Sequence, residues 1–182
     1  MLLLVLLTLA AVPAADPCAS VLPPAVLTAA TNAYPGFRVV RGSDYSAEDL
    51  GYAKEDGFPC PGIASSDVDG DGTADFAFFL LSAKGAALLV SARIPPGSSI
   101  RIGMLMDFGR RGLGRSFVHP LDSGKYADMY AADSGPDDFT PDPGRVRGHT
   151  SRRPGFGAGT MEASEIAFFF TGRRWVHLWL SD

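Results

Sequence analysis

Apolar residues gather in unbroken runs in the middle of the chain. The runs at 76–81 and 86–94 are almost entirely apolar and are separated by Lys84 and Gly85, a pattern typical of a β-hairpin. Because neither run alternates with polar residues, we expect both strands to lie in a central sheet that is covered on both faces. A third strand is predicted at 100–106.

A closing hairpin is predicted at the end of the chain, with strands at 165–170 and 175–180. Alternate residues of a strand point to the same side, so Trp175, His177 and Trp179 share one face of the last strand. A packed or surface histidine is the default interpretation of this stripe. An aromatic binding face is the alternative.

The first third of the chain carries helical signals. One helix is predicted within 18–33, after Pro23-Pro24, a short strand at 37–40, and a second helix from the cap residues near 43–49 to about residue 54. The sequence therefore predicts an α+β fold in which N-terminal helices pack on a mostly antiparallel sheet. The segment 108–160 is dense in Gly, Pro, Asp and Arg, and we expect it to be irregular.

Length and composition indicate one globular domain. The chain has 182 residues, of which 46% are hydrophobic and 20% charged, and its formal net charge is −4. No concentrated basic face is evident, which argues against a nucleic-acid partner. We expect a single domain at 16–182, and no span of the mature chain is apolar enough to cross a membrane.

The N-terminal stretch 1–15 has the features of a signal peptide. It carries no charge, and its apolar run at 2–11 is too short for a membrane helix, which needs about 20 apolar residues. Small residues follow at the expected cleavage positions. The sequence therefore predicts a secreted or periplasmic protein. A buried N-terminal element of a cytoplasmic protein is the alternative.

The mature chain contains two cysteines, Cys18 and Cys60. An even number of cysteines in an exported protein favours a disulfide bond. Closing a loop of about 40 residues would stabilise the fold by roughly 3–4 kcal/mol in the chain-entropy model. Two buried free thiols are the alternative.

Four aspartates alternate with small residues in the segment 67–75, which reads Asp-Val-Asp-Gly-Asp-Gly-Thr-Ala-Asp. Carboxylates so close together repel one another, and a hard divalent cation removes the repulsion. Calcium prefers six to eight oxygen ligands. The predicted metal ligands are the side chains or carbonyls of Asp67, Asp69, Asp71, Thr73 and Asp75. A solvated Asp/Gly turn without a metal is the alternative.

The loop begins like an EF-hand but does not continue as one. An EF-hand needs a glutamate at its twelfth position and a helix on each side, whereas Phe78 stands at that position within a predicted strand. The segment 67–75, followed by Phe76-Ala77-Phe78, resembles the calcium hairpin of FG-GAP and VCBS-type repeats. That resemblance implies a calcium-binding loop leading into a strand. A propeller needs several such blades, and the chain carries one motif.

The sequence contains no HExxH pair, no GxSxG elbow and no phosphate-binding glycine loop, and no catalytic residue is assigned. We expect an exported calcium-binding module with a structural role or a role in binding a protein or ligand. The first alternative is a hydrolase in the 108–160 segment, with His119 near Asp122 and Ser116. The second is an inhibitor or immunity-type partner of another exported protein, which would use the Arg/Asp-rich segment as its contact surface.

Overall fold

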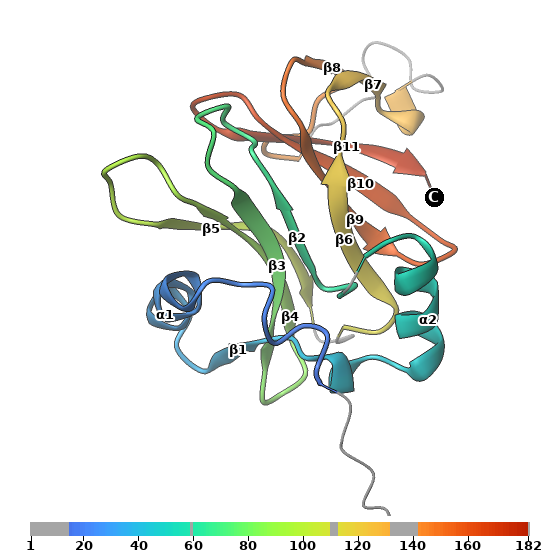
Figure 1. Ribbon diagram of the computed structural model, residues 1–182. Helices are drawn as coiled ribbons and strands as arrows, with labels where there is room; N and C mark the ends of the chain where they lie inside the picture. Colours follow the sequence, from blue (N-terminus) through green and yellow to red (C-terminus); the bar gives the residue numbers. More distant parts are fainter. Residues whose placement is uncertain (1–14, 59, 110–112, 132–141, 182) are drawn as a thin grey trace, which may run out of the picture.

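The computed structural model describes residues 15–58, 60–109, 113–131 and 142–181 (Figure 1). The predicted signal peptide at 1–15 lies outside these residues, apart from Ala15. None of the helices in the described ranges is long and apolar enough to span a membrane.

Within the described residues, both α-helices lie in the first third of the chain, and the rest is mostly β-strand (Figure 1). The helical elements are α1 (Pro24–Ala33), η1 (Gly42–Asp44), α2 (Ala47–Glu55) and η2 (Met129–Ala131). The strands of the first half are β1 (Phe37–Val39), β2 (Ile63–Ser66), β3 (Asp75–Ser82), β4 (Ala87–Arg93) and β5 (Arg101–Gly109). Those of the second half are β6 (Ser116–Leu121), β7 (Gly124–Ala127), β8 (Gly148–Ser151), β9 (Gly155–Thr160), β10 (Glu165–Phe170) and β11 (Trp175–Ser181).

Sheet A contains the predicted central hairpin. Its order is β1-β3-β4-β5, and β2 pairs with the first half of β3 while β1 pairs with the second half. Every neighbouring pair in it is antiparallel. All six residues from Asp75 to Leu80 are buried, which confirms the expectation that this strand is covered on both faces.

Sheet B has the order β11-β10-β9-β6, again antiparallel throughout. The main hydrophobic core draws side chains from both sheets and from α1, including Val26, Phe78 and Phe168. A second cluster lies on the outer face of sheet B, where the β7–β8 ribbon places Tyr126 and His149 against Phe169. The predicted mixture of helices and antiparallel sheets is confirmed, with β-structure the larger part.

The N-terminal helix begins where the two prolines indicate. The sequence predicts helix within 18–33 after Pro23-Pro24, and α1 spans Pro24–Ala33 with Pro23 as its cap residue. Proline is favoured in the first helical turn because its missing N–H is not needed there. The second helix agrees with its predicted signals, since Ser46 caps α2 and accepts a hydrogen bond from the Asp49 amide at 3.1 Å.

The expectation that segment 108–160 is irregular is wrong for its described part. Strands β6 to β9 lie within it and contribute two strands of sheet B and the whole β7–β8 ribbon. These strands escaped detection because they carry glycine and proline where strands normally carry β-branched residues. Pro120 is tolerated because β6 is an edge strand, which leaves one side without a hydrogen-bonded neighbour in sheet B. Residues 110–112 and 132–141 of the predicted irregular segment lie outside the described ranges.

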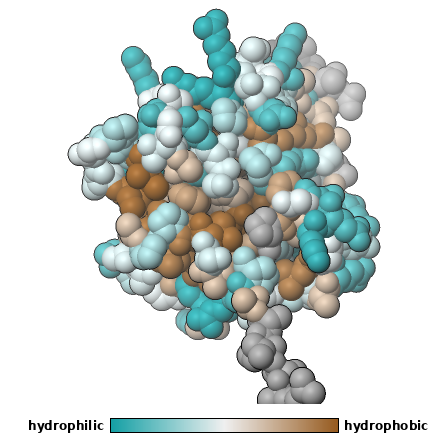
Figure 2. Space-filling model, viewed as in Figure 1, coloured by the Kyte–Doolittle hydropathy of each residue, from teal (hydrophilic) through white to brown (hydrophobic). Residues whose placement is uncertain are grey.

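Apolar surface is unevenly distributed over the face seen in Figure 2. It gathers beside α1, and hydrophilic side chains project at the end of the molecule that carries β7 and β8 (Figure 2). Met104, on the edge strand β5, is 55% exposed. The two ends of this face therefore differ in character.

Candidate metal site

The acidic loop connects β2 to β3 at one end of sheet A. Ser66 and Asp75 are partners in the antiparallel pairing of these strands, so the loop closes a hairpin. Gly70 and Gly72 adopt left-handed backbone angles, with φ of 75° and 87°. Glycine takes these angles at no steric cost, and the two positions let the chain turn tightly around its own carboxylates.

The side chains of Asp67, Asp69 and Asp71 converge. Each offers one carboxylate oxygen, and the three oxygens lie within 4.8 Å of one another. The loop backbone holds two of these carboxylates in place. Asp67 accepts hydrogen bonds from the amides of residues 70, 71 and 72 at 2.7–3.1 Å, and Asp71 accepts one from the Thr73 amide at 2.8 Å. The acidic cluster is thus organised by local hydrogen bonds.

Asp69 is the member of the cluster that faces the rest of the protein. One of its oxygens lies 3.4 Å from Nε of Arg93, and its Oδ1 atom is buried without a hydrogen-bond partner among the described residues. A buried carboxylate oxygen with no partner is costly unless a cation is bound nearby. The donor set, three carboxylates with one unsatisfied oxygen, therefore fits a hard metal ion.

Two arginines lie against this loop. The Arg93 guanidinium carbon lies 3.6 Å from the centre of the Phe170 ring, so Arg93 joins the loop to strand β10 of the other sheet. Arg153 packs over Gly70, where an added Cβ would lie 2.7 Å from its Nε atom. The acidic cluster therefore has positive charge on two sides.

Asp75 is placed differently from the three clustered aspartates. It is buried, and its oxygens accept hydrogen bonds from the amides of Ile94 at 2.9 Å and Val68 at 3.3 Å. Burial, assisted by the charge of Asp69, raises the pKa of Asp75 to about 6. In this structure Asp75, at one end of the loop, is hydrogen-bonded to Val68 near the other end. Its predicted role as a metal ligand, like that of the Thr73 carbonyl, stays a prediction.

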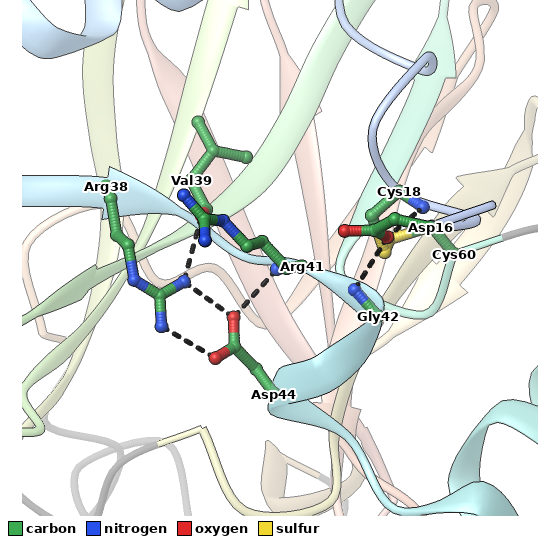
Figure 3. The surroundings of a disulfide bond; sticks show 8 residues. All are labelled: Asp16, Cys18, Arg38, Val39, Arg41, Gly42, Asp44 and Cys60. Atoms are coloured by element: carbon green, nitrogen blue, oxygen red, sulfur yellow. Dashed lines mark hydrogen bonds and ion pairs between the residues drawn. A yellow bond between two sulfur atoms is a disulfide. The ribbon is translucent and has the colours of Figure 1, made fainter. Parts of the chain in front are cut away.

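The predicted disulfide bond between Cys18 and Cys60 is confirmed (Figure 3). It joins residues 42 positions apart, and both cysteines are buried. Asp16 fixes the chain beside it, because its Oδ1 atom accepts hydrogen bonds from the amides of Cys18 and Gly42 at 2.9 and 2.8 Å (Figure 3). The bond ties the first described residues to the segment that leads into β2, and it fits an oxidising compartment.

The stripe of Trp175, His177 and Trp179 contacts the protein itself. Trp175 packs beside the Phe170 ring, and Trp179 beside the Tyr130 ring. The amide of His177 donates to the Gly144 carbonyl at 2.9 Å, and burial lowers the pKa of its imidazole. All three side chains are partly covered by neighbouring elements. The predicted binding face at this position stays a prediction.

The hydrolytic grouping suggested by the sequence is not assembled around His119. Ser116 and His119 lie an odd number of residues apart on β6, so their side chains point to opposite faces of sheet B. Nε2 of His119 instead lies 2.8 Å from an oxygen of Glu165 on β10, a partner that sequence proximity did not indicate. The alternating glycines of β9 are the signal that could have revealed the pair, because they leave room between β6 and β10.

The Arg/Asp-rich segment contributes to the interior as well as to the surface. Arg145 makes two hydrogen bonds, of 2.9 and 2.8 Å, to the fully buried carboxylate of Asp128. Asp128 also accepts from the amides of Trp179 and Tyr130. Burial alone would raise the pKa of Asp128, but these hydrogen bonds outweigh it and hold the pKa below its ordinary value. This arginine therefore acts as an internal partner.

Comparison of the chain with models of known protein families, with curated proteins and with solved structures finds no match. The resemblance to FG-GAP and VCBS-type repeats rests on the residues of the acidic loop. What the structure supports directly is a cluster of Asp67, Asp69 and Asp71 with the geometry of a cation site.

Proposed function

We propose that this protein is an exported module whose acidic loop binds calcium, and that the ion stabilises the domain for a structural or binding role. The observation that carries the proposal is the convergence of the Asp67, Asp69 and Asp71 carboxylates within 4.8 Å. Calcium suits such a cluster because it accepts many oxygen ligands in a flexible geometry. The Thr73 carbonyl and Asp75 would complete the shell after a small rearrangement.

Three features support the choice of an exported calcium module over a bare acidic turn. The Cys18–Cys60 disulfide fits an oxidising environment. The apolar leader predicts export, and calcium outside the cytoplasm suits loops with dissociation constants of about 0.1–1 mM. The buried Asp69 oxygen lacks a hydrogen-bond partner among the described residues, and calcium would coordinate it.

The ion would stabilise the contact between the two sheets. Asp69 belongs to the loop at the end of sheet A, and it pairs with Arg93, whose guanidinium stacks on Phe170 of sheet B. Fixing Asp69 around a cation would hold this junction in one arrangement. The proposed role of calcium is therefore to bind the folded state and so raise the free energy of unfolding of the domain.

The test is unfolding of the protein with calcium, with magnesium and with a chelator, for the wild type and for Asp71→Asn. At about 10 mM calcium, a dissociation constant of about 0.1–1 mM gives a stabilisation of about 1.4–2.7 kcal/mol. We expect calcium to raise the unfolding midpoint more than magnesium does. Asp71→Asn should lose most of this response, because it removes one charged ligand.

Asp107→Asn is the matched control. Asp107 is exposed and accepts a hydrogen bond from the amide two residues ahead at 2.7 Å, as Asp71 does at 2.8 Å. Asparagine can keep that hydrogen bond in both places, so only the loss of a metal ligand distinguishes the two variants. An equal calcium response in Asp71→Asn and Asp107→Asn, or no response in the wild type, would contradict the proposal.

A further inference from the structure

A second candidate site lies away from the acidic loop, at the edge of sheet B formed by β6. A cavity of about 290 Å³ opens there between α2, β6 and the turn from β9 to β10. Its lining includes four rings and two charged groups, from Tyr52, Phe58, Phe117, His119, Arg115 and Glu162. The volume lies at the lower end of ligand-binding pockets, which suits one ring with a small substituent.

His119 is held in a fixed orientation at this cavity. Its ring lies 5.5 Å from the Phe58 ring and 5.6 Å from the Phe117 ring. Its Nε2 atom is bound to Glu165 at 2.8 Å, across strand β9. A Cβ at Gly157 would overlap both atoms of that pair, so the pair depends on the glycine between them. In the tautomer that places the proton on Nε2, facing Glu165, Nδ1 is the ring nitrogen that accepts a hydrogen bond.

Arg115 provides hydrogen-bond donors, whereas Nδ1 of His119 provides an acceptor. Its Nε donates to Asp49 on α2 at 3.0 Å, and its Nη1 donates to Glu162 at 2.8 Å. Its Nη2 atom is buried and has no hydrogen-bond partner among the described residues. Glu162 reaches Arg115 from a left-handed backbone conformation, with φ of 59°, which a residue other than glycine adopts only at a cost.

The charges around the cavity determine which class of ligand fits. Asp49 and Glu162 both pair with Arg115, so its positive charge is already balanced. The carboxylate of Asp56 also lines the cavity. A carboxylate ligand would therefore enter an environment with excess negative charge. Nη2, which is buried without a partner among the described residues, instead favours an uncharged acceptor such as a carbonyl oxygen once the Arg115 side chain turns it toward the cavity.

We propose that this cavity binds a small uncharged aromatic compound that carries a hydrogen-bond acceptor and a donor side by side, as a primary aromatic amide does. The ring packs among Phe58, Phe117 and His119. The carbonyl oxygen accepts from Nη2 of Arg115, and the amide N–H donates to Nδ1 of His119. None of these residues belongs to the acidic loop, so the proposal does not depend on calcium binding.

The test uses three probes that share one ring: benzamide, benzoate and benzylamine. Each is titrated into the isotope-labelled protein while the backbone amide signals are followed by NMR. We expect benzamide to cause saturable shifts confined to α2, β6 and the β9–β10 turn, with a dissociation constant of about 1 mM, as is typical of so small a compound. Benzoate and benzylamine should bind at least about tenfold more weakly.

Two matched variants locate the site. Phe117→Leu removes a ring from the cavity wall, whereas Phe37→Leu removes a similarly half-buried strand ring in sheet A. We expect Phe117→Leu to weaken benzamide binding at least about fivefold and Phe37→Leu to leave it unchanged. Spectra that otherwise match the wild type would show that both variants fold.

Three results would overturn the proposal. Benzamide shifts that do not saturate, or that map elsewhere, would show that benzamide does not bind in this cavity. Equal binding by wild type and Phe117→Leu would remove the role of the aromatic wall. Tighter binding of benzoate than of benzamide would show that Arg115 acts as an unbalanced cation, which contradicts the assigned ligand class.

Discussion

The acidic loop and the cavity beside α2 solve opposite electrostatic problems. The loop gathers three carboxylates of like charge and leaves one Asp69 oxygen without a hydrogen-bond partner among the described residues. The cavity surrounds Arg115 with two carboxylates and leaves its Nη2 atom without such a partner. On the proposals above, the first arrangement takes a metal ion in addition to the positive charges of Arg93 and Arg153, and the second takes a neutral acceptor. The unsatisfied atom therefore indicates the class of ligand better than the number of charged residues does.

The two regions also differ in how the chain builds them. The hydrogen bonds that organise the acidic cluster join residues no more than five positions apart. The cavity depends on contacts across much greater separations, since Arg115 meets Asp49 66 residues away and His119 meets Glu165 46 residues away. We therefore expect the loop to tolerate changes elsewhere in the fold, and the cavity to respond to them.

The largest effect is expected from Gly157→Ala, which tests this dependence at the glycine between His119 and Glu165. The new Cβ would overlap His119 Nε2 and Glu165 Oε1 and force the pair apart. Overpacking of this kind costs up to about 3 kcal/mol. Denaturant unfolding should show that loss, and the calcium response of the loop should remain intact.

Gly103→Ala is the matched control for this change. Gly103 also lies in a strand, but its added Cβ would be 3.6 Å from the nearest atom, the Ser91 hydroxyl, which is an ordinary contact. Its replacement should be neutral, or stabilising by up to about 1 kcal/mol. In a His119→Ala background, Gly157→Ala should cost clearly less than in the wild type. Additive costs would show that the glycine is needed for some other reason.

The contrast in sequence separation explains what the sequence could predict. The segment 67–75 contains all of its own candidate ligands, so their spacing was enough to locate the cluster. Strands β3, β4, β10 and β11 could also be predicted, because each is rich in apolar residues that become buried in the sheet. Such features depend on neighbours in the sequence.

The cavity could not be predicted in the same way, because its chemistry depends on which strands become neighbours. The sequence places His119 near Ser116 and Asp122, yet its partner Glu165 lies two strands away across Gly157. The alternating glycines of β9 suggested an irregular segment when taken alone. In the sheet they supply the space that lets side chains of β6 and β10 meet. Strand order, which the sequence did not supply, determines this arrangement.

A smaller effect is expected from Asp49→Asn, which disturbs the charge balance of the cavity. Burial alone would raise the pKa of Asp49, but hydrogen bonds from Ser46 and Arg115 outweigh it and lower the pKa. A lowered folded-state pKa stabilises the fold above the unfolded pKa of about 3.9, and that stability is lost as the pH falls through the folded value. The variant should therefore cost about 1–2 kcal/mol at pH 7, and the difference from wild type should shrink below about pH 4.

Asp56→Asn, at the C-cap of the same helix, is the control for the effect on stability. Asp56 is exposed at the C-terminal end of α2, where a negative charge is not favoured by the helix dipole, so its loss should cost nothing. Asp49→Asn should also strengthen benzoate binding relative to benzamide, because one of the two carboxylates on Arg115 is gone. A cost for Asp49→Asn that stays constant between pH 7 and pH 3 would show that its charge is not what stabilises the fold.

The smallest effect is expected at the other region, from Arg153→Gln. Arg153 packs over Gly70 and places a positive charge beside the cluster that calcium would enter. Removing that charge should tighten calcium binding about two- to threefold, and the gain should fall as salt is added, because Arg153 is exposed and its field is screened. Arg152→Gln removes the same charge one residue away and should change calcium affinity less. Calcium titrations at low and high salt measure both variants. Equal effects would mean that the loop responds to net charge alone, whereas a larger effect at Arg153 would show that its contact with Gly70 limits the affinity of the loop.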